Sequence, residues 1–166
     1  MVDAEQPRWL SEEEQRSWVA LVCLLVSLPA ALDAQLQADA NLNHVEYVVL
    51  SWLSMSPEQT TRMSALASVS NTTLSHLSRI VTRLEKCGWV RRAPDPQDGR
   101  STLAILTDAG LQKVAATAPG HVETVRSLVF DPLTKAQARQ LQVIVARLLH
   151  ALGSYHDRPE TPAASS

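Results

Sequence analysis

The stretch RLEKCGWVRRAPDPQDGRSTLAILTDAG, residues 83–110, predicts a helix end, a β-hairpin and a helix start in close succession. Gly88 is the stop signal, because glycine readily adopts the left-handed conformation that ends many helices. Residues 89–92 and 103–106 are short runs with apolar side chains and predict two strands. The segment between them is rich in Pro, Asp and Gly, with Gly99 permitting a tight tip, and Thr107 predicts the N-cap of the next helix.

Helices are predicted on both sides of this hairpin. Ser11 and Glu14 form a capping box that starts a helix reaching about residue 36, with a kink rather than an end at Pro29. Asn71 is expected in the left-handed conformation of a turn between two shorter helices. Further helices are expected at residues 43–55, 65–69, 74–87, 108–130 and 135–152. Six helices with a hairpin after the fourth predict a mainly α, winged helix-turn-helix fold with a small β-hairpin wing.

Residues 62–100 form a basic segment in an otherwise acidic chain. The chain has 166 residues and a formal net charge of −2. Within residues 62–100, seven basic residues outnumber three acidic ones, which gives a net charge of +4 and leaves −6 for the remainder. A local excess of positive charge indicates a polyanionic partner for this segment alone.

The predicted fourth helix has two faces of different chemistry. One face is apolar and consists of Leu74, Leu77, Val81 and Leu84. The other combines bases with small hydroxyl residues: Ser75, Arg79, Thr82, Arg83 and Lys86, flanked by His76 and Ser78. Small hydroxyl residues allow close approach to a major groove, and arginine reaches guanine edges or phosphates. A basic surface helix would show the same polarity, but the turn before it and the hairpin after it favour DNA recognition.

Residues 63–110, MSALASVSNTTLSHLSRIVTRLEKCGWVRRAPDPQDGRSTLAILTDAG, resemble the MarR family of winged-helix regulators. RLEKCGWVRR is similar to the family's Arg-Leu-Glu-Lys-x-Gly-hydrophobic-Val-x-Arg. DPQDGRSTLAILTDAG is similar to its Asp-Pro-x-Asp-x-Arg wing followed by Leu-Thr-x-x-Gly. The chain departs from the family at Ser70, Asn71 and Cys87, where an apolar residue, a glycine and a charged residue are usual. These departures leave the expected fold intact and the base preference open.

The resemblance implies a transcriptional regulator, more often a repressor, that binds a pseudo-palindromic operator in double-stranded DNA as a homodimer. The fourth helix would enter the major groove and the wing would lie toward the minor groove, with Arg100 as the wing arginine and Asp98 orienting it. A small, often aromatic, anionic ligand would release the DNA. The residues expected to contact DNA are Thr73, Ser75, His76, Ser78, Arg79, Thr82, Arg83, Lys86, Arg91, Arg92, Asp98, Arg100 and Ser101.

The terminal helices are expected to form the dimer, because the small winged unit does not need their apolar faces. The resemblance implies that the terminal helices of two subunits interleave. The expected interface residues are Trp18, Leu21, Leu25, Ile144, Leu148 and Leu152. The chain would then divide into a flexible arm (1–10), an N-terminal dimerisation helix (11–42), a DNA-binding domain (43–107), C-terminal dimerisation helices (108–153) and a disordered tail (154–166).

Aromatic and basic side chains near the first two predicted helices suggest an effector pocket. Its expected members are Trp18, His44, Tyr47 and Trp52, with Arg62 as the partner of an anion. Packing in the core and in the dimer interface accounts for the same residues. His121, His150 and His156 are expected at the surface or in an interface.

The two cysteines and five histidines show no metal-ligand spacing, and the sequence contains no recognisable phosphate loop or catalytic constellation. Neither an enzyme, nor a metal site, nor a cofactor is therefore expected. Cys23 lies in an apolar run and is expected to be a buried, inert thiol, whereas Cys87 lies beside Lys86. A cysteine-based redox regulator of the same fold and a winged-helix protein-interaction module without DNA binding remain as alternatives.

A cytoplasmic protein without membrane contact is expected. Two thiols in a chain of this size suit a reducing compartment. The apolar run at residues 19–28 is about ten residues long, short of the ~20 needed to span a bilayer. Acidic residues at 12–14 precede it, unlike the basic start of a signal peptide.

Overall fold

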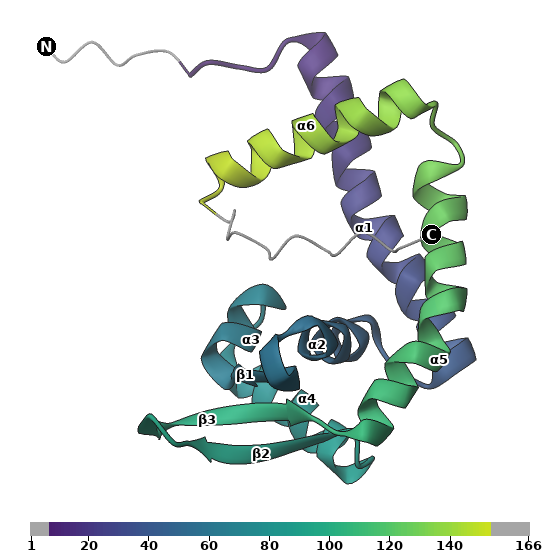
Figure 1. The fold of residues 1–166 in the computed structure, drawn as a ribbon. Helices are drawn as coiled ribbons and strands as arrows, with labels where there is room; N and C mark the ends of the chain where they lie inside the picture. Colours follow the sequence, from purple (N-terminus) through teal and green to yellow (C-terminus); the bar gives the residue numbers. More distant parts are fainter. Residues whose placement is uncertain (1–6, 154–166) are drawn as a thin grey trace, which may run out of the picture. The chain divides into compact units, whose positions relative to one another are not determined.

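The computed structural model describes residues 7–153, which divide into two compact units with the boundary between Thr124 and Val125. The first unit contains α1 (Glu12–Ala40), α2 (His44–Met55), the short turn η1 (Pro57–Gln59), β1 (Thr60–Arg62), α3 (Met63–Val69), α4 (Leu74–Lys86), β2 (Val90–Asp95), β3 (Asp98–Leu106) and α5 (Asp108–Val125) (Figure 1). The second contains the π-helical turn η2 (Arg126–Phe130) and α6 (Lys135–Ala151). The predicted mainly α, winged helix-turn-helix fold is confirmed. Residues 1–6 of the predicted arm and the predicted tail at 154–166 lie outside the described residues.

Local sequence signals set most helix ends. Three helices begin with capping boxes, formed by Ser11 and Glu14, by Asn43 and Glu46, and by Thr134 and Gln137. α1 continues through Pro29, as expected, but reaches Ala40 and ends at Asn41 with a left-handed φ of 51°. Asn71 has the predicted positive φ, 48°, and turns the chain between α3 and α4.

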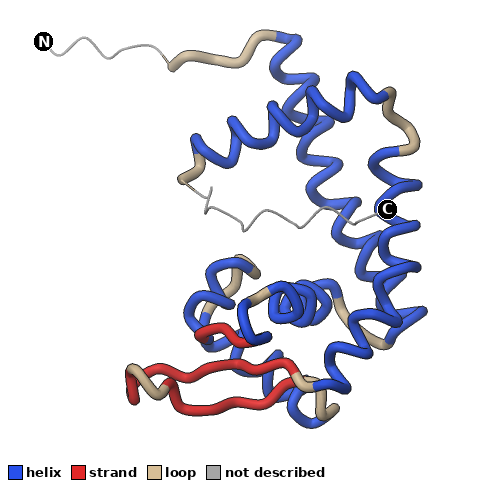
Figure 2. Tube along the Cα trace, viewed as in Figure 1, coloured by secondary structure: helices blue, strands red, loops and turns tan. Residues whose placement is uncertain are grey.

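The wing is part of a three-stranded antiparallel sheet with the strand order β1-β3-β2 (Figure 2). β2 pairs with β3 from Val90 opposite Leu106 onward, and β1 pairs with the other edge of β3. The sequence does not predict β1, because three residues without apolar alternation give no strand pattern. Both expected strands are longer than predicted. Pro96 and Gln97 form the tip, whereas Gly99 lies inside β3 without a positive φ, so the predicted role of Gly99 is wrong.

The core of the first unit packs α4 against α2, α3 and the C-terminal half of α1. The buried face of α4 consists of Leu77, Ile80, Val81 and Leu84. Leu74, which the sequence places on this face, is 53% exposed. It is the first residue of the helix, and the packed face begins one turn later. Fully buried side chains elsewhere in this core include Leu36, Leu42, Leu50, Leu53 and Leu66.

Thr107 and Gly110 join the sheet to α5. The Thr107 hydroxyl donates to the carbonyl oxygen of Gly88 at 2.6 Å and accepts from the backbone N–H of Gly110 at 3.0 Å. The predicted N-cap is therefore confirmed, and it also ties the start of α5 to the end of α4. Gly110 is buried so close to Trp89 that a Cβ at this position would overlap the Trp89 carbonyl oxygen and lie 2.7 Å from Leu106 Cδ1.

The N-terminal half of α1 and all of α6 expose apolar side chains. Residues 12–31 include no buried residue, and neither does α6. By length and composition alone, α1 is apolar enough to cross a bilayer, since an 18-residue window has a mean hydropathy of 2.0 and is 11% buried. The apolar run at residues 19–28 therefore underestimates the apolar length of this helix. A core helix of a soluble protein meets the same criterion.

Candidate nucleic-acid interface

α4 presents a basic, hydroxyl-rich face to solvent. Ser75, His76, Arg79, Arg83 and Lys86 are exposed, and Ser78 and Thr82 are partly buried. Thr73 is the N-cap, because its hydroxyl accepts the backbone N–H of His76 at 3.2 Å. Within the part of the chain that the structure describes, four cations of α4 and the wing form no ion pair: Arg79, Lys86, Arg91 and Arg100. Their charge is available to a polyanion.

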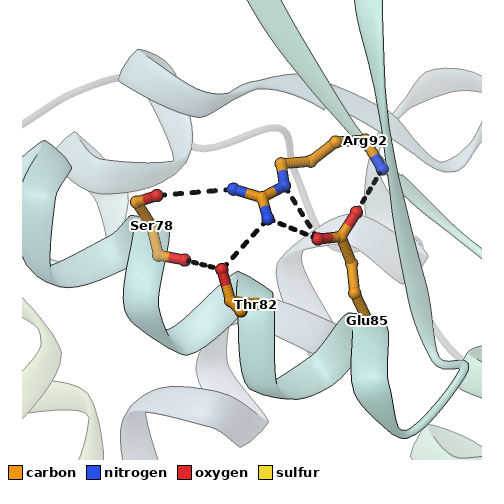
Figure 3. A network of polar contacts seen from close by, with 4 residues as sticks. All are labelled: Ser78, Thr82, Glu85 and Arg92. Atoms are coloured by element: carbon orange, nitrogen blue, oxygen red, sulfur yellow. Dashed lines mark hydrogen bonds and ion pairs between the residues drawn. The ribbon is translucent and has the colours of Figure 1, made fainter.

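Arg92, the last residue of the RLEKCGWVRR motif, binds α4 instead of projecting into solvent (Figure 3). Its Nε donates to Glu85 Oε2 at 2.8 Å, and its Nη2 donates to Thr82 Oγ1 at 3.0 Å and also pairs with Glu85. Its backbone N–H donates to Glu85 Oε1 at 2.9 Å. A longer contact of 3.4 Å joins Nη1 to Ser78 Oγ. Three of the residues expected to contact DNA, Arg92, Thr82 and Ser78, are therefore bonded to one another.

Arg83 connects the end of α4 to the junction of α1 and α2. Its Nη1 lies 3.1 Å from Glu46 Oε1, and its Nη2 donates to the carbonyl oxygen of Asn41 at 3.3 Å. Glu46 is almost completely buried and also accepts the backbone N–H of Asn43 at 2.9 Å. Arg83 itself is about half exposed. The structure thus adds to the expected DNA contact of Arg83 an internal bond that the sequence does not predict.

An ion pair holds the wing near its tip. Arg62 Nε, on β1, lies 2.7 Å from Asp95 Oδ2, at the end of β2. Asp95 is buried, and its other oxygen accepts the backbone N–H of Gln97, which closes the tip at 2.9 Å. The structure therefore places Arg62 at the wing and pairs it there, away from the other residues expected in the effector pocket.

Asp98 organises the backbone from which Arg100 projects. Its carboxylate accepts the backbone N–H of Arg100 at 3.1 Å and the hydroxyl of Ser101 at 2.7 Å. The hydrogen bonds from Ser101 and then from Arg100 lower the pKa of the Asp98 carboxyl, so it is charged at neutral pH. Asp98 contacts Arg100 through the main chain, which leaves the exposed guanidinium to solvent.

A groove of about 410 Å³ lies between α3, the N-terminal part of α4 and the wing. Its lining consists of Met63, Ser64, Leu74, Ser78, Arg92, Arg100, Ser101 and Thr102. Hydroxyl and guanidinium groups are the donors that proteins direct at phosphate oxygens. The groove therefore offers a basic, hydroxyl-lined surface beside the outward face of α4.

A second group of polar side chains lies where α1, α2 and α5 meet. The ring of His121 lies 4.5 Å from that of Tyr47 and 6.5 Å from that of His44, measured between centroids. His121 Nδ1 is 3.4 Å from Gln35 Oε1, and Asp33 accepts the backbone N–H of His44 at 2.8 Å. Desolvation, and to a lesser extent the positive charge of nearby His44, lowers the pKa of His121. His44 Nδ1 is buried and has no hydrogen-bond partner among the described residues.

Of the expected pocket residues, only His44 and Tyr47 come together. Trp52 is partly buried against the core, and Trp18 is 53% exposed on the N-terminal half of α1. Sequence reasoning missed His121 and Gln35, because no spacing pattern connects residues on α1, α2 and α5. Their proximity depends on how the helices pack.

Both cysteines are exposed. The expectation of a buried Cys23 is wrong for the single chain, because Cys23 lies on the half of α1 whose side chains are exposed. Across residues 7–153 no group of three or more His, Cys, Asp or Glu side chains is arranged to hold a metal ion.

Comparison with known proteins places this geometry among transcriptional regulators. Residues 42–102 match the sequence profile of the MarR family. Sco3205 of Streptomyces coelicolor, a MarR family transcriptional regulator whose crystal structure contains DNA, is 44% identical and superimposes with a TM-score of 0.85 over 94% of each chain. The chain therefore shares a fold with a DNA-bound regulator along nearly its whole length.

Two curated relatives match over shorter regions. The uncharacterised HTH-type transcriptional regulator YdcH of Bacillus subtilis is 37% identical over 102 residues, which cover 60% of this chain and 69% of YdcH. The HTH-type transcriptional repressor IacR of Pseudomonas putida is 35% identical over 82 residues, 48% of this chain and 47% of IacR. The chain thus spans about half the length of that repressor.

Proposed function

Because this chain belongs to the MarR family of transcriptional regulators, we propose that it binds a pseudo-palindromic operator in double-stranded DNA as a homodimer and acts as a repressor. A small aromatic or anionic ligand would release it. The observation that carries the proposal is the set of unpaired cations on two adjoining elements, Arg79 and Lys86 on α4 and Arg100 on the wing.

The arrangement of these cations suits a duplex. The outward face of α4 carries small hydroxyls with Arg79 and Lys86, a composition that fits a major groove. Arg100 and Ser78 of α4 both line the groove of about 410 Å³. A helix in the major groove and a wing at the adjacent minor groove must straddle one sugar-phosphate strand, and the hydroxyl-lined groove supplies donors for it.

Exposed apolar surface supports the homodimer. Five of the expected interface residues are 46–73% exposed in the single chain: Trp18, Leu25, Ile144, Leu148 and Leu152. Leu21 is partly buried. Large apolar side chains left exposed in this way on each of the two units mark interaction sites in a soluble protein. A second copy of the chain, related by a two-fold axis, would cover the same surface on both subunits and place two α4 helices on one face of DNA.

The His44, Tyr47 and His121 cluster supports the effector site. It combines aromatic rings with a buried nitrogen, His44 Nδ1, that lacks a partner among the described residues. It lies where α1 meets α2, and a ligand bound there would shift the population between two orientations of α1 and the DNA-binding elements. Only one orientation would match two successive half-sites.

Because both thiols are exposed, an oxidant can reach them, and a cysteine-based redox regulator is kept as the second candidate. If cysteine oxidation were the signal, the double variant Cys23→Ser with Cys87→Ser would lose its response to peroxide. We expect the double variant to bind DNA and to respond to its ligand like the wild type.

An electrophoretic shift assay on the promoter region next to the protein's own gene, at two salt concentrations, tests the proposal. Selective binding that weakens steeply with salt is expected, because phosphate neutralisation releases counterions. The variant Arg79→Ala should bind more weakly than the wild type. Equal affinity for promoter and unrelated DNA, or no binding at low salt, would reject DNA-binding regulation and favour the protein-interaction module.

A further inference from the structure

Arg92 lines the groove of the proposed DNA-binding surface, but its hydrogen bonds are made to residues of α4. Its side chain is 32% exposed, and all three guanidinium nitrogens bond to α4. Glu85, the acid of this helix, uses both carboxylate oxygens on Arg92, one for the backbone N–H and one for the guanidinium (Figure 3). Both the backbone and the side chain of Arg92 therefore bind Glu85, which joins β2 of the wing to the last turns of α4.

We propose that Arg92 is a positioning residue that sets the distance between α4 and the wing, and that it does not bind DNA phosphate. This inference rests on the proposed DNA-binding function and assigns these residues their part in it. For Arg92 to reach a phosphate it would have to leave Glu85, and the unpaired carboxylate would then repel the DNA. Hydrogen bonds between an arginine and a carboxylate are also stronger than neutral ones, and here Nε and Nη2 both donate to Glu85 Oε2 while the backbone N–H of Arg92 donates to Oε1.

The hydroxyls around the pair point to the same role. Thr82 donates its hydroxyl to the carbonyl oxygen of Ser78 at 2.8 Å and accepts from Arg92 with the same oxygen. Ser78 Oγ is the partner of Arg92 Nη1. Thr82 and Ser78 are thus, with Glu85, the partners on α4 that hold the Arg92 guanidinium.

The wing transmits this constraint to Arg100. Arg92, on β2, is paired with Ala104 on β3. Arg100 also lies on β3, nearer the tip than Ala104. Ion pairing between Arg62 and Asp95 holds the sheet close to that tip. With one end fixed to α4 by Arg92, the hairpin holds Arg100 at a set distance from the outward face of α4.

Removal of Glu85 distinguishes a positioning residue from a phosphate contact, because the two roles predict opposite signs. If Arg92 contacts phosphate, Glu85→Gln releases the arginine and removes a negative charge, so DNA affinity rises and the salt dependence steepens. If Arg92 positions the wing, Glu85→Gln loosens the wing and operator affinity falls. The conservative variant Arg92→Lys separates them again, since lysine keeps the charge but cannot span Glu85 and Thr82.

The experiment measures operator affinity and its salt slope for the full-length wild type, Glu85→Gln, Arg92→Ala, Arg92→Lys and the double variant Glu85→Gln with Arg92→Ala. We expect each single variant to lose operator affinity about tenfold, and the double variant to lose no more than either single, because one shared interaction is lost. The salt slope of Arg92→Ala should stay unchanged. In the control Arg79→Ala, which removes an unpaired cation, the slope should fall by about one.

Amide hydrogen exchange on the free protein measures the order of the wing directly and so tests the positioning role without DNA. Faster exchange of wing amides at residues 90–106 is expected in Glu85→Gln and Arg92→Ala and not in Arg79→Ala. Tighter operator binding by Glu85→Gln, wild-type affinity in Arg92→Lys, or a salt slope reduced by one in Arg92→Ala would overturn the positioning role. A wild type that ignores promoter DNA while these exchange differences persist would reject the proposed function alone.

Discussion

Arg83 Nη1 lies 3.1 Å from Glu46 Oε1, so α4, the helix proposed to face DNA, is bonded to the first turn of α2. Glu46 is buried and also completes the capping box of α2 through the backbone N–H of Asn43. The same arginine donates to the carbonyl oxygen of Asn41, the residue that ends α1. One side chain of α4 thus contacts the point where the proposed dimerisation helix meets the DNA-binding elements.

Glu46→Gln should destabilise the protein by about 1–3 kcal/mol, because a charged hydrogen-bonding partner of Arg83 and of Asn43 is replaced by a neutral one in a buried position. Urea unfolding monitored by circular dichroism measures the change. Glu58→Gln, on an exposed residue of η1, serves as the control. Equal stability of the two variants would mean that Glu46 contributes neither the cap nor the ion pair.

Arg100→Ala should weaken operator binding by about 1–3 kcal/mol without changing the oligomeric state. Its guanidinium forms no ion pair in the described chain, and Asp98 fixes only its backbone. Fluorescence anisotropy with the promoter fragment gives the affinity. Arg126→Ala, outside α4 and the wing, is the control, and a wild-type affinity for Arg100→Ala would leave Arg100 an exposed residue of β3 without a part in DNA binding.

Gly110→Ala should lower the free energy of unfolding by about 1–3 kcal/mol, because the added Cβ overlaps the Trp89 carbonyl oxygen and crowds Leu106. Backbone must move to accommodate it, since the carbonyl cannot rotate away. Gly99→Ala is the matched control, as a Cβ there meets nothing within 4 Å. If thermal unfolding shows both variants to be equally stable, the close approach at Gly110 has no energetic consequence.

Stability should fall as the pH drops below about 6.5, in part because of His121. Desolvation and nearby His44 lower the pKa of His121, so the folded state binds its proton less readily than the unfolded state. Stability from the neutral ring is fully present above the unfolded pKa and is lost as the pH falls through that value toward the lowered folded one. The variant His121→Gln should show a shallower fall in Tm between pH 7.5 and pH 5.5. An unchanged pH profile would contradict this linkage.

Leu148→Glu should convert the proposed dimer into monomers, because a charge would be buried in the apolar interface. Leu148 is 46% exposed in the single chain and lies on α6, whose side chains are all at least partly exposed. Sedimentation velocity measures the molecular mass. Gln140→Glu, on an exposed position of the same helix, introduces the same charge and should leave the dimer intact. Persistent dimers in Leu148→Glu would exclude α6 from the interface.

Local signals in the sequence were sufficient for the helices and the hairpin. Ser11 caps α1 and Thr107 caps α5, both as predicted. The strand β1 was missed because it is defined by pairing with β3, which no pattern within three residues reveals. The prediction of a buried Leu74 is wrong because helical periodicity indicates which face of a helix is apolar, but not at which residue that face begins to pack against the core.

The candidate site was less predictable than the fold. Residue type and helical face identified the cations of α4, but the partners of those cations come from other elements. Glu85 forms an ion pair with Arg92, and Glu46 forms one with Arg83. Both pairs join residues of different elements and so depend on tertiary structure. Residue type and helical face therefore do not predict that Arg83 and Arg92 also bond within the protein.

Hydroxyl-radical footprinting of the promoter region by the wild type, beside Arg79→Ala and Arg100→Ala, tests the central claim most directly. Two related protected patches with centres about 34–36 Å apart, one helical turn, are predicted, because two α4 helices of a dimer read successive major grooves. Arg100→Ala should lose protection at the flanking minor grooves first, while Arg79→Ala should weaken every patch. A single unpaired patch, or uniform protection of any DNA offered, would contradict binding of an operator by a symmetric dimer.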